Sequence, residues 1–193
     1  MTKGLKTGLG CLVVIIVIVV ILFSVVKGIY NSLVTLDENV NNSWAQVENQ
    51  LKRRYDLIPN LVETVKGFAK QEREVLTEVT RARASVGNAQ TPAQSIEANN
   101  SLSSALSRLL VVVERYPELK SDQNFLKLQD ELAGTENRIA VERRRYNDTV
   151  RELNQKIRTF PTVLFAGLLG FEKREYFDIP AAEEAAPKVD FNN

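Results

Sequence analysis

The feature that most constrains this chain is an uninterrupted apolar run close to its N-terminus. Twenty uncharged residues, TGLGCLVVIIVIVVILFSVV, lie between Lys6 and Lys27. At about 1.5 Å per helical residue this run spans roughly 30 Å, the thickness of a bilayer's hydrocarbon core. The sequence therefore predicts a transmembrane helix at residues 7–27, after a short tail at residues 1–6.

A cleaved leader peptide is the alternative interpretation of this run. The segment FSVVKGIYNS at its end offers no convincing small-x-small cleavage site. Cys11 comes before the apolar stretch, whereas the cysteine of a lipoprotein would follow it. We therefore expect an uncleaved single-pass anchor in the cell (inner) membrane.

The charges that flank the anchor predict its orientation. Lys3 and Lys6 precede it, whereas Lys27 is followed by Asp37 and Glu38. Positive charge favours the cytoplasmic side of a membrane helix. The tail is accordingly expected in the cytoplasm, and the rest of the chain outside it.

After the anchor, apolar residues recur at steps of three and four, which is typical of helices with one buried face. Three long helices are predicted, at about residues 29–86, 92–115 and 121–157. Gly87 would terminate the first, and Thr91 would cap the second, with Gln94 completing a capping box. Ser121 is the predicted cap of the third helix, which ends before Pro161.

A shorter apolar segment, TVLFAGLLGF at residues 162–171, reaches only roughly 15 Å as a helix and is too short to cross a bilayer. We expect it to pack on the bundle as a short fourth helix, with the membrane interface as the alternative. The bundle domain then covers residues 28–172, and the Pro/Ala/acid-rich tail at residues 173–193 is expected to be disordered. The predicted fold is all-α: an N-terminal transmembrane helix followed by an antiparallel helical bundle with three long helices plus a short fourth.

The stretch RRYDLIPNL at residues 53–61 places a proline inside the first of these helices. A hairpin would need residues with turn chemistry, and only Pro59 and Asn60 supply any. The apolar register also continues in phase from Leu51 to Ile58. We therefore expect one long helix with a kink at Pro59, and a break at Pro59 is the alternative.

Two interpretations fit the arginines of this stretch. In the simpler one, Arg53 and Arg54 belong to a solvated face. In the other, one of them pairs with Glu142, which interrupts the apolar stripe of the third helix, because a half-buried carboxylate needs a partner. Such a pair would fix the register between the helices. The residues that we consider structural or interaction candidates are Trp44, Arg53, Arg54, Asp56, Pro59, Asn60 and Glu142.

The composition argues against catalysis and against binding of nucleic acid. The chain contains no histidine, and it lacks the GxxxxGK[ST], GxSxG and HExxH motifs. Its 25 basic and 24 acidic residues leave a net charge of +1, so no bulk charge favours nucleic acid. We expect a protein that is not an enzyme, with no cofactor, no metal site and no small-molecule substrate.

Several long segments resemble the LemA family of bacterial single-pass membrane proteins. They are YNSLV at residues 30–34, WAQVENQLKRRYDLIPNLVETVKGFAKQE at 44–72, RAR at 81–83, ERYPELKSDQNFLKLQDELAGTENRIAVERRRYNDTV at 114–150, and FP at 160–161. The resemblance implies a membrane helix followed by a helical bundle. It implies no established catalytic activity, cofactor or substrate.

The function expected from these observations is a non-enzymatic membrane scaffold or adaptor that acts through protein–protein association. A regulator or sensor that transmits a signal along the continuous membrane-to-bundle helix is the alternative. The expected partners are the lipid bilayer, other copies of the chain and other membrane proteins. The first predicted helix is longer than the others, so a stretch from Leu33 to Trp44 would stay uncovered and form a homo-oligomer interface.

Overall fold

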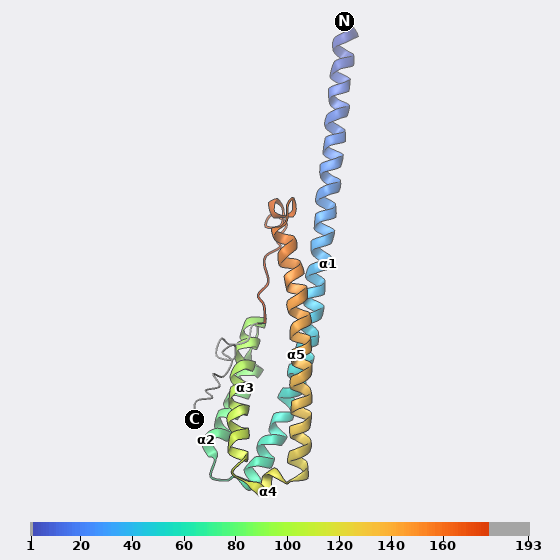
Figure 1. Cartoon of the computed structure of the whole chain (residues 1–193). Coiled ribbons are helices and arrows are strands. Elements are labelled where there is room, and N and C mark those ends of the chain that lie inside the picture. Colours follow the sequence, from blue (N-terminus) through green and yellow to red (C-terminus); the bar gives the residue numbers. More distant parts are fainter. Residues whose placement is uncertain (1, 178–193) are drawn as a thin grey trace, which may run out of the picture. The chain divides into compact units, whose positions relative to one another are not determined.

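The computed structural model describes residues 2–177, with the surroundings of side chains from Leu12 onward. No strand occurs in this part of the chain, so the predicted all-α class is confirmed. The elements are α1 (Thr2–Phe68), α2 (Arg73–Asn88), α3 (Pro92–Val113), α4 (Pro117–Lys120), α5 (Gln123–Arg158) and the 3₁₀ turn η1 (Thr162–Leu164) (Figure 1).

The predicted membrane segment lies in the first part of α1. Every side chain from Leu12 to Phe23 is at least 50% exposed, on all sides of the helix. A helix that is apolar all round and contacts no protein core has the character of a membrane span. Within the described residues α1 is the one candidate span. The predicted anchor is therefore confirmed as a candidate membrane helix.

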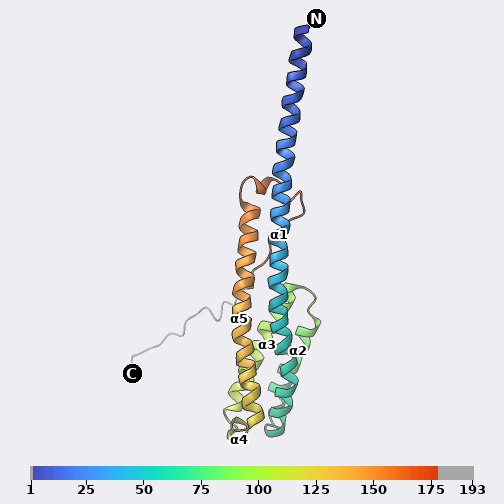
Figure 2. The ribbon, with the colours of Figure 1, turned by 90° about the vertical axis from the view of Figure 1, so that its right-hand side faces the viewer.

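α1 continues through Pro59 without a break, so the hairpin alternative is wrong. The kink at Pro59 stays a prediction. The far boundary of the helix was also predicted wrongly, because α1 ends at Phe68 and not near Val86. The chain reverses at residues 69–72, and α2 then runs back beside α1 (Figures 1 and 2). Ala69 lies in this turn and its methyl group is fully buried.

The chain divides into two compact units. Unit 1 comprises Met1–Asn42 and Asp148–Arg174, and unit 2 comprises Ser43–Asn147 and the residues from Glu175 onward. In unit 2 the end of α1, α2, α3, α4 and the first part of α5 share one apolar core. Its fully buried large side chains are Ile58, Leu61, Val65, Val79, Leu102, Leu109, Leu119 and Phe125.

Hydrogen bonds to the first-turn amides identify the N-terminal caps of α3 and α5. The Gln94 amide donates to the Thr91 hydroxyl oxygen at 3.2 Å, which confirms the predicted cap. The cap of α5 is Asp122, whose carboxylate accepts from the Phe125 amide at 2.9 Å. The prediction of Ser121 was wrong by one residue. The Ser121 hydroxyl instead donates to carbonyls at the end of α4.

Unit 1 buries the stretch of α1 that the sequence predicted to be uncovered. On α1, Leu33 is 0% exposed and Val40 is 2% exposed. On the last part of α5, Val150 and Leu153 are both 0% exposed. The predicted mismatch of helix lengths was wrong because α1 stops eighteen residues before the expected end. The homo-oligomer stays a prediction without that support.

The end of the described chain differs from the prediction in two ways. Residues 162–171 form a 3₁₀ turn and further turns, and not a short fourth α-helix. The first part of the tail is ordered: the Asn154 side chain makes two hydrogen bonds with the Arg174 backbone, and Asn147 makes two with the Phe177 backbone. An asparagine side chain has both N–H donors and a carbonyl acceptor, so it can pair with the backbone N–H and C=O of an extended segment as a neighbouring strand would. The rest of the predicted disordered tail lies outside the described residues.

Candidate functional site

Arg54 forms a buried polar centre between three helices of unit 2. Its position between Leu51 and Ile58 places it on the buried face of α1, where its exposed fraction is 2%. Its guanidinium donates to the Ser103 hydroxyl at 2.8 Å and to a Glu136 carboxylate oxygen at 2.9 Å. The other terminal nitrogen donates to the side-chain and backbone oxygens of Asn99, at 2.7 and 3.2 Å. One side chain thus ties α1 to α3 and α5.

The partners of Arg54 are themselves held in place. The Asn99 amide nitrogen donates to the Ser95 carbonyl at 2.8 Å, which leaves the Asn99 side-chain oxygen facing the guanidinium. Desolvation lowers the pKa of Arg54, and the Glu136 carboxylate opposes this shift. Because the ordinary pKa of arginine lies far above neutrality, the group stays charged. It therefore acts as a fixed hydrogen-bond donor and not as a base.

The predicted pair with Glu142 is wrong. Glu142 is half-buried and pairs with Arg145 on its own helix at 2.9 Å. The carboxylate that reaches Arg54 comes from Glu136, six residues earlier in α5. The reversal at residues 69–72 changes which turn of α5 faces Arg54. The solvated-face interpretation holds for Arg53, which is exposed, and fails for Arg54.

Pro59 acts through a carbonyl group one turn earlier in α1. Without an N–H group, Pro59 cannot bond to the carbonyl of Tyr55, four residues before it. The Arg83 Nε–H from α2 donates to that oxygen at 3.2 Å. The same guanidinium lies over the Tyr55 ring, 3.8 Å from its centroid. Pro59 thus leaves an acceptor on α1 that α2 uses to bind.

The other predicted residues lie apart from the Arg54 centre. Asp56 and Asn60 are exposed, and Asp56 pairs with Lys52 one turn away on the same face. Trp44 is half-buried in an aromatic cluster, with ring centroids 5.3 Å from Tyr146 and 6.3 Å from Phe177. This contact is internal to unit 2, so Trp44 is a packing residue here.

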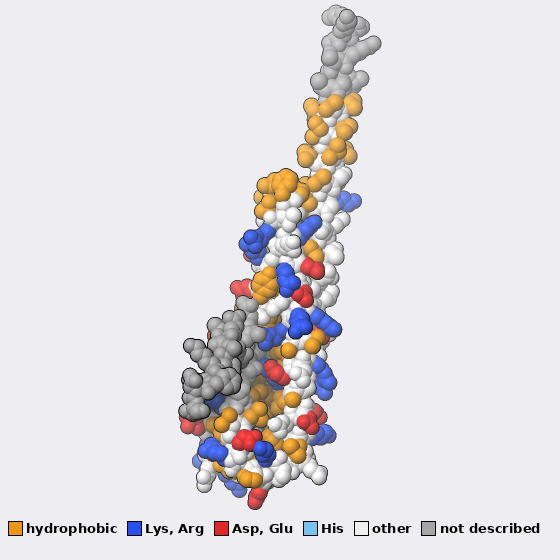
Figure 3. Space-filling model, viewed as in Figure 1, with side chains coloured by type: hydrophobic (Ala, Val, Ile, Leu, Met, Phe, Trp, Pro, Cys, Tyr) orange, Lys and Arg blue, Asp and Glu red, His pale blue; other side chains and the backbone are white. Residues whose placement is uncertain are grey.

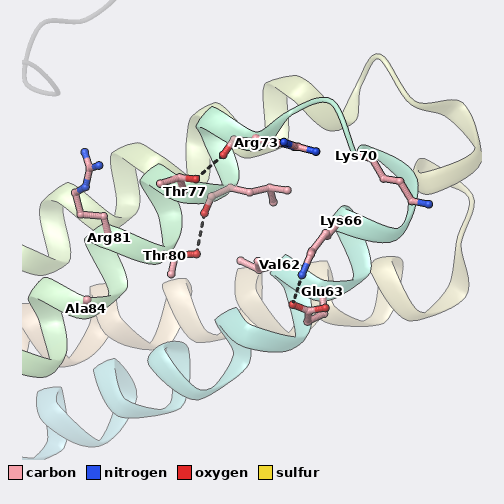
Figure 4. Close-up of a pocket in the computed structure, with 10 residues that line it drawn as sticks. Val62, Glu63, Lys66, Lys70, Arg73, Thr77, Thr80, Arg81 and Ala84 are labelled. Atoms are coloured by element: carbon pink, nitrogen blue, oxygen red, sulfur yellow. Dashed lines mark hydrogen bonds and ion pairs between the residues drawn. The ribbon is translucent and has the colours of Figure 1, made fainter.

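A groove of about 850 Å³ lies between α1 and α2 in unit 2, and the sequence analysis missed it (Figure 4). Apolar side chains from both helices form part of its wall, and the rim is basic. The lining residues are Val62, Glu63, Lys66, Lys70, Arg73, Leu76, Thr77, Thr80, Arg81 and Ala84. Four basic and one acidic side chain leave a net charge of three positive. The cluster KGFAKQER at residues 66–73 was the available signal, but the reversal that folds it into a groove has no distinctive turn residues.

The groove has cations that are available to a ligand. Lys66 pairs with Glu63 at 3.2 Å, with both side chains more than 60% exposed. Lys70, Arg73 and Arg81 make no ion pair with any residue that the structure describes. The hydroxyls of Thr77 and Thr80 donate to carbonyls of their own helix. The groove therefore suits a ligand with acidic and apolar groups, and it presents no nucleophile next to a base.

Metal chemistry has no candidate among the residues described. No group of three His, Cys, Asp or Glu side chains there is arranged to hold a metal ion. The arrangement that remains is the buried Arg54 centre and the separate basic groove between α1 and α2.

Curated relatives cover most of the chain. Magnetosome protein MamQ 2 from Paramagnetospirillum magneticum is 27% identical over 174 residues, which is 77% of this chain and 64% of that protein. Magnetosome protein MamQ from Magnetospirillum gryphiswaldense is 25% identical over the same shares. Protein LemA from Metamycoplasma hominis is 27% identical over 143 residues, or 74% of this chain and 65% of that protein. The chain spans slightly less than two thirds of the length of these relatives.

The family match covers all but one of the segments that suggested it, since YNSLV at residues 30–34 lies before the matched range. The sequence profile of the LemA family matches residues 43–191, which is well over half of the chain. This range includes the Arg54 centre, the Arg83 contact and the groove between α1 and α2. The chain belongs to the LemA family.

Proposed function

We propose that this protein is a non-enzymatic membrane-anchored scaffold, and that it binds a partner protein in the groove between α1 and α2. The observation that carries the proposal is the basic rim around an apolar wall in that groove. The partner segment is one that presents aspartate or glutamate side chains next to apolar ones. Such a segment matches the groove in both charge and hydrophobicity.

The walls of the groove are held before any partner binds. Arg83 fastens α2 to the Tyr55 carbonyl of α1, and Val79 of α2 is fully buried in the core. The Arg54 network then fixes α1 against α3 and α5. A groove with fixed walls loses little conformational entropy on binding, which favours affinity.

The electrostatic contribution comes from the unpaired cations. Lys70, Arg73 and Arg81 are exposed, so they steer an acidic segment at long range and keep it in register when bound. The single acidic residue, Glu63, is already paired with Lys66 and repels an incoming carboxylate only weakly.

Crosslinking of the full chain in native membranes tests this function. A photocrosslinking amino acid replaces Thr77 in the groove, and in a control it replaces Lys127, which is exposed on α5. We expect a discrete partner at Thr77 whose captured peptide is acidic, and no such product at Lys127. The double change Lys70→Glu and Arg73→Glu should abolish capture, whereas Arg53→Glu should leave it intact. Capture that survives the double change, or capture of the chain's own residues after Pro180, would contradict the proposal.

A second candidate function is a sensor that transmits a signal along α1. The observation that favours it is the unbroken helix from the apolar run to Phe68. A sensor would change its crosslinked partners with growth conditions, whereas a scaffold would keep the same set. The same crosslinking experiment, repeated across conditions, separates the two.

A further inference from the structure

The loop after α5 carries an apolar surface that unit 1 leaves uncovered. We call Phe160, Val163, Leu164 and Leu168 the apolar tip. Their exposed fractions are 75%, 52%, 59% and 87%. Burying one such side chain stabilises a protein by about 1.5–3 kcal/mol, so four exposed together suggest a surface that is covered in the working protein.

The loop is a built element. The amides of Phe165 and Ala166 both donate to the Thr162 carbonyl at 2.9 Å, and the Phe171 amide donates to the Ala166 carbonyl at 2.9 Å. Thr162 and Ala166 are each 2% exposed, so these two side chains of the loop are buried. Gly170 closes it with a φ of 82°, which a side chain would disfavour. The exposed side chains are those that this compact loop directs outward.

Two contacts within unit 1 fix the base of the loop on α1. The Phe171 ring packs against the Tyr30 ring, with centroids 5.9 Å apart. Arg174 then binds Asp37 with two hydrogen bonds, of 2.9 and 3.2 Å. Tyr30 follows Lys27, the first charge after the apolar run, by three residues. The base of the loop is therefore attached within about one helical turn of the predicted membrane boundary.

The tip faces the apolar end of the unit. Figures 1 and 2 show the loop beside α1 at the end of α5, on the side toward the N-terminus, and Figure 3 shows hydrophobic side chains covering this end of the unit. Two exposed basic residues belong to the same unit as the apolar tip: Arg158 at the end of α5 and Lys27 on α1. Apolar side chains next to lysine and arginine are the composition of segments that lie in the headgroup region of a membrane.

We propose that the apolar tip inserts into the headgroup–acyl boundary of the leaflet from which α1 emerges. Unit 1 then has two membrane contacts, the α1 span and the tip, joined through Tyr30 and Asp37. One helix alone leaves rotation about its axis free, whereas a second contact removes that freedom. The tip therefore sets how unit 1 is oriented on the bilayer surface. This inference does not depend on the groove or its partner.

Fluorescence quenching in vesicles tests the insertion. The full chain with Cys11→Ser and Leu168→Cys is labelled with an environment-sensitive fluorophore and reconstituted in vesicles of equal parts phosphatidylcholine and phosphatidylglycerol. A matched control carries the label at Glu152→Cys, an exposed position earlier on α5. We expect the label at residue 168 to emit at shorter wavelength, to be quenched by brominated acyl chains and to be protected from aqueous iodide. The control label should show the reverse pattern.

Two other environments of the tip, water and a second copy of the chain, would give different results. Quenching by iodide and not by brominated lipid at residue 168 would place the tip in water and overturn the proposal. A blue shift that disappears when the protein is diluted into excess lipid, without bromine quenching, would assign the tip to a second copy and also overturn it. Phe160→Ser in the labelled chain should weaken bromine quenching while the protein stays in the vesicle fraction, because α1 still spans the bilayer.

Discussion

Replacing Arg54 with alanine should destabilise unit 2 strongly, whereas the same change at Arg53 should have little effect. The two arginines are adjacent, but Arg54 is 2% exposed and makes four hydrogen bonds, while Arg53 lies in solvent. The variant at Arg54 leaves the side-chain oxygen of the buried Asn99 without a donor. The Asn99 carbonyl lies within α3 and keeps its helical hydrogen bond. Each buried acceptor without a partner costs about 1–3 kcal/mol, and Ser103 and Glu136 can turn to water.

The expected loss in free energy of unfolding is therefore about 1–3 kcal/mol for Arg54→Ala and within about 0.5 kcal/mol of zero for Arg53→Ala. Arg54→Lys should fall between them, because an ammonium group keeps the charge but cannot reach both oxygens of Asn99 and the Glu136 carboxylate at once. Glu136 is 54% exposed at its side chain, so its coupling to Arg54 should be about 1 kcal/mol or less. Coupling between Arg54 and Glu142 should be absent.

The assay is urea unfolding of the full chain in nanodiscs. Trp44, the single tryptophan, lies in unit 2 against Tyr146 and reports the transition by its fluorescence. Equal midpoints for the alanine variants at Arg53 and Arg54 would refute the reasoning. A double-mutant cycle that finds coupling between Arg54 and Glu142 and no coupling between Arg54 and Glu136 would also refute it.

Three further predictions use the same unfolding assay. Pro59→Ala should raise the free energy of unfolding by up to about 3 kcal/mol, because proline is unfavourable inside a helix. It should also speed hydrogen exchange in α2, because the new amide of residue 59 competes with Arg83 for the Tyr55 carbonyl. Unchanged exchange in α2 would contradict this. Gly134→Ala should stabilise the protein by about 1 kcal/mol, because the added methyl group enters open space. Gly87→Ala should stabilise it less, because that methyl group would lie 3.2 Å from the Tyr55 hydroxyl oxygen. Equal stabilisation by the two changes would contradict this contact. The hydrogen bond from Tyr116 to Glu72 raises the pKa of Tyr116, so its stabilisation is complete below the ordinary tyrosine pKa of about 10 and is lost as pH rises through the raised value. The stability gap between the natural chain and Tyr116→Phe should therefore close at alkaline pH, and a constant gap would argue against this hydrogen bond.

The sequence predicts the helical class, the anchor and the continuity of α1 through Pro59, because each depends on local periodicity or length. For Arg54 the sequence leaves a solvated face and a buried pair both open, and the fold decides for the buried position. The partner of Arg54 was missed because the register between helices depends on where the chain turns. Residues 70–72 are Lys, Gln and Glu, all good helix formers, and the apolar pattern resumes in phase at Leu76. Nothing local distinguishes that turn from a continued helix.

The groove and the loop contacts depend on tertiary structure in the same way. Lys66 and Arg73 lie on different helices, and only the turn between them brings both to one groove. Asn147 and Asn154 are ordinary surface residues of a helix by sequence. Their role in binding residues 174–177 requires the chain to fold back along α5.

A charge swap tests the central claim, that the groove between α1 and α2 recognises an acidic segment of a partner protein. The chain with Lys70→Glu and Arg73→Glu is expressed in native membranes with the partner captured at Thr77, either unchanged or with its captured acidic residues replaced by lysine. The account predicts that crosslinking at Thr77 is lost with the unchanged partner and returns with the lysine partner. Loss of crosslinking in both cases, or undiminished crosslinking with the unchanged partner, would contradict it.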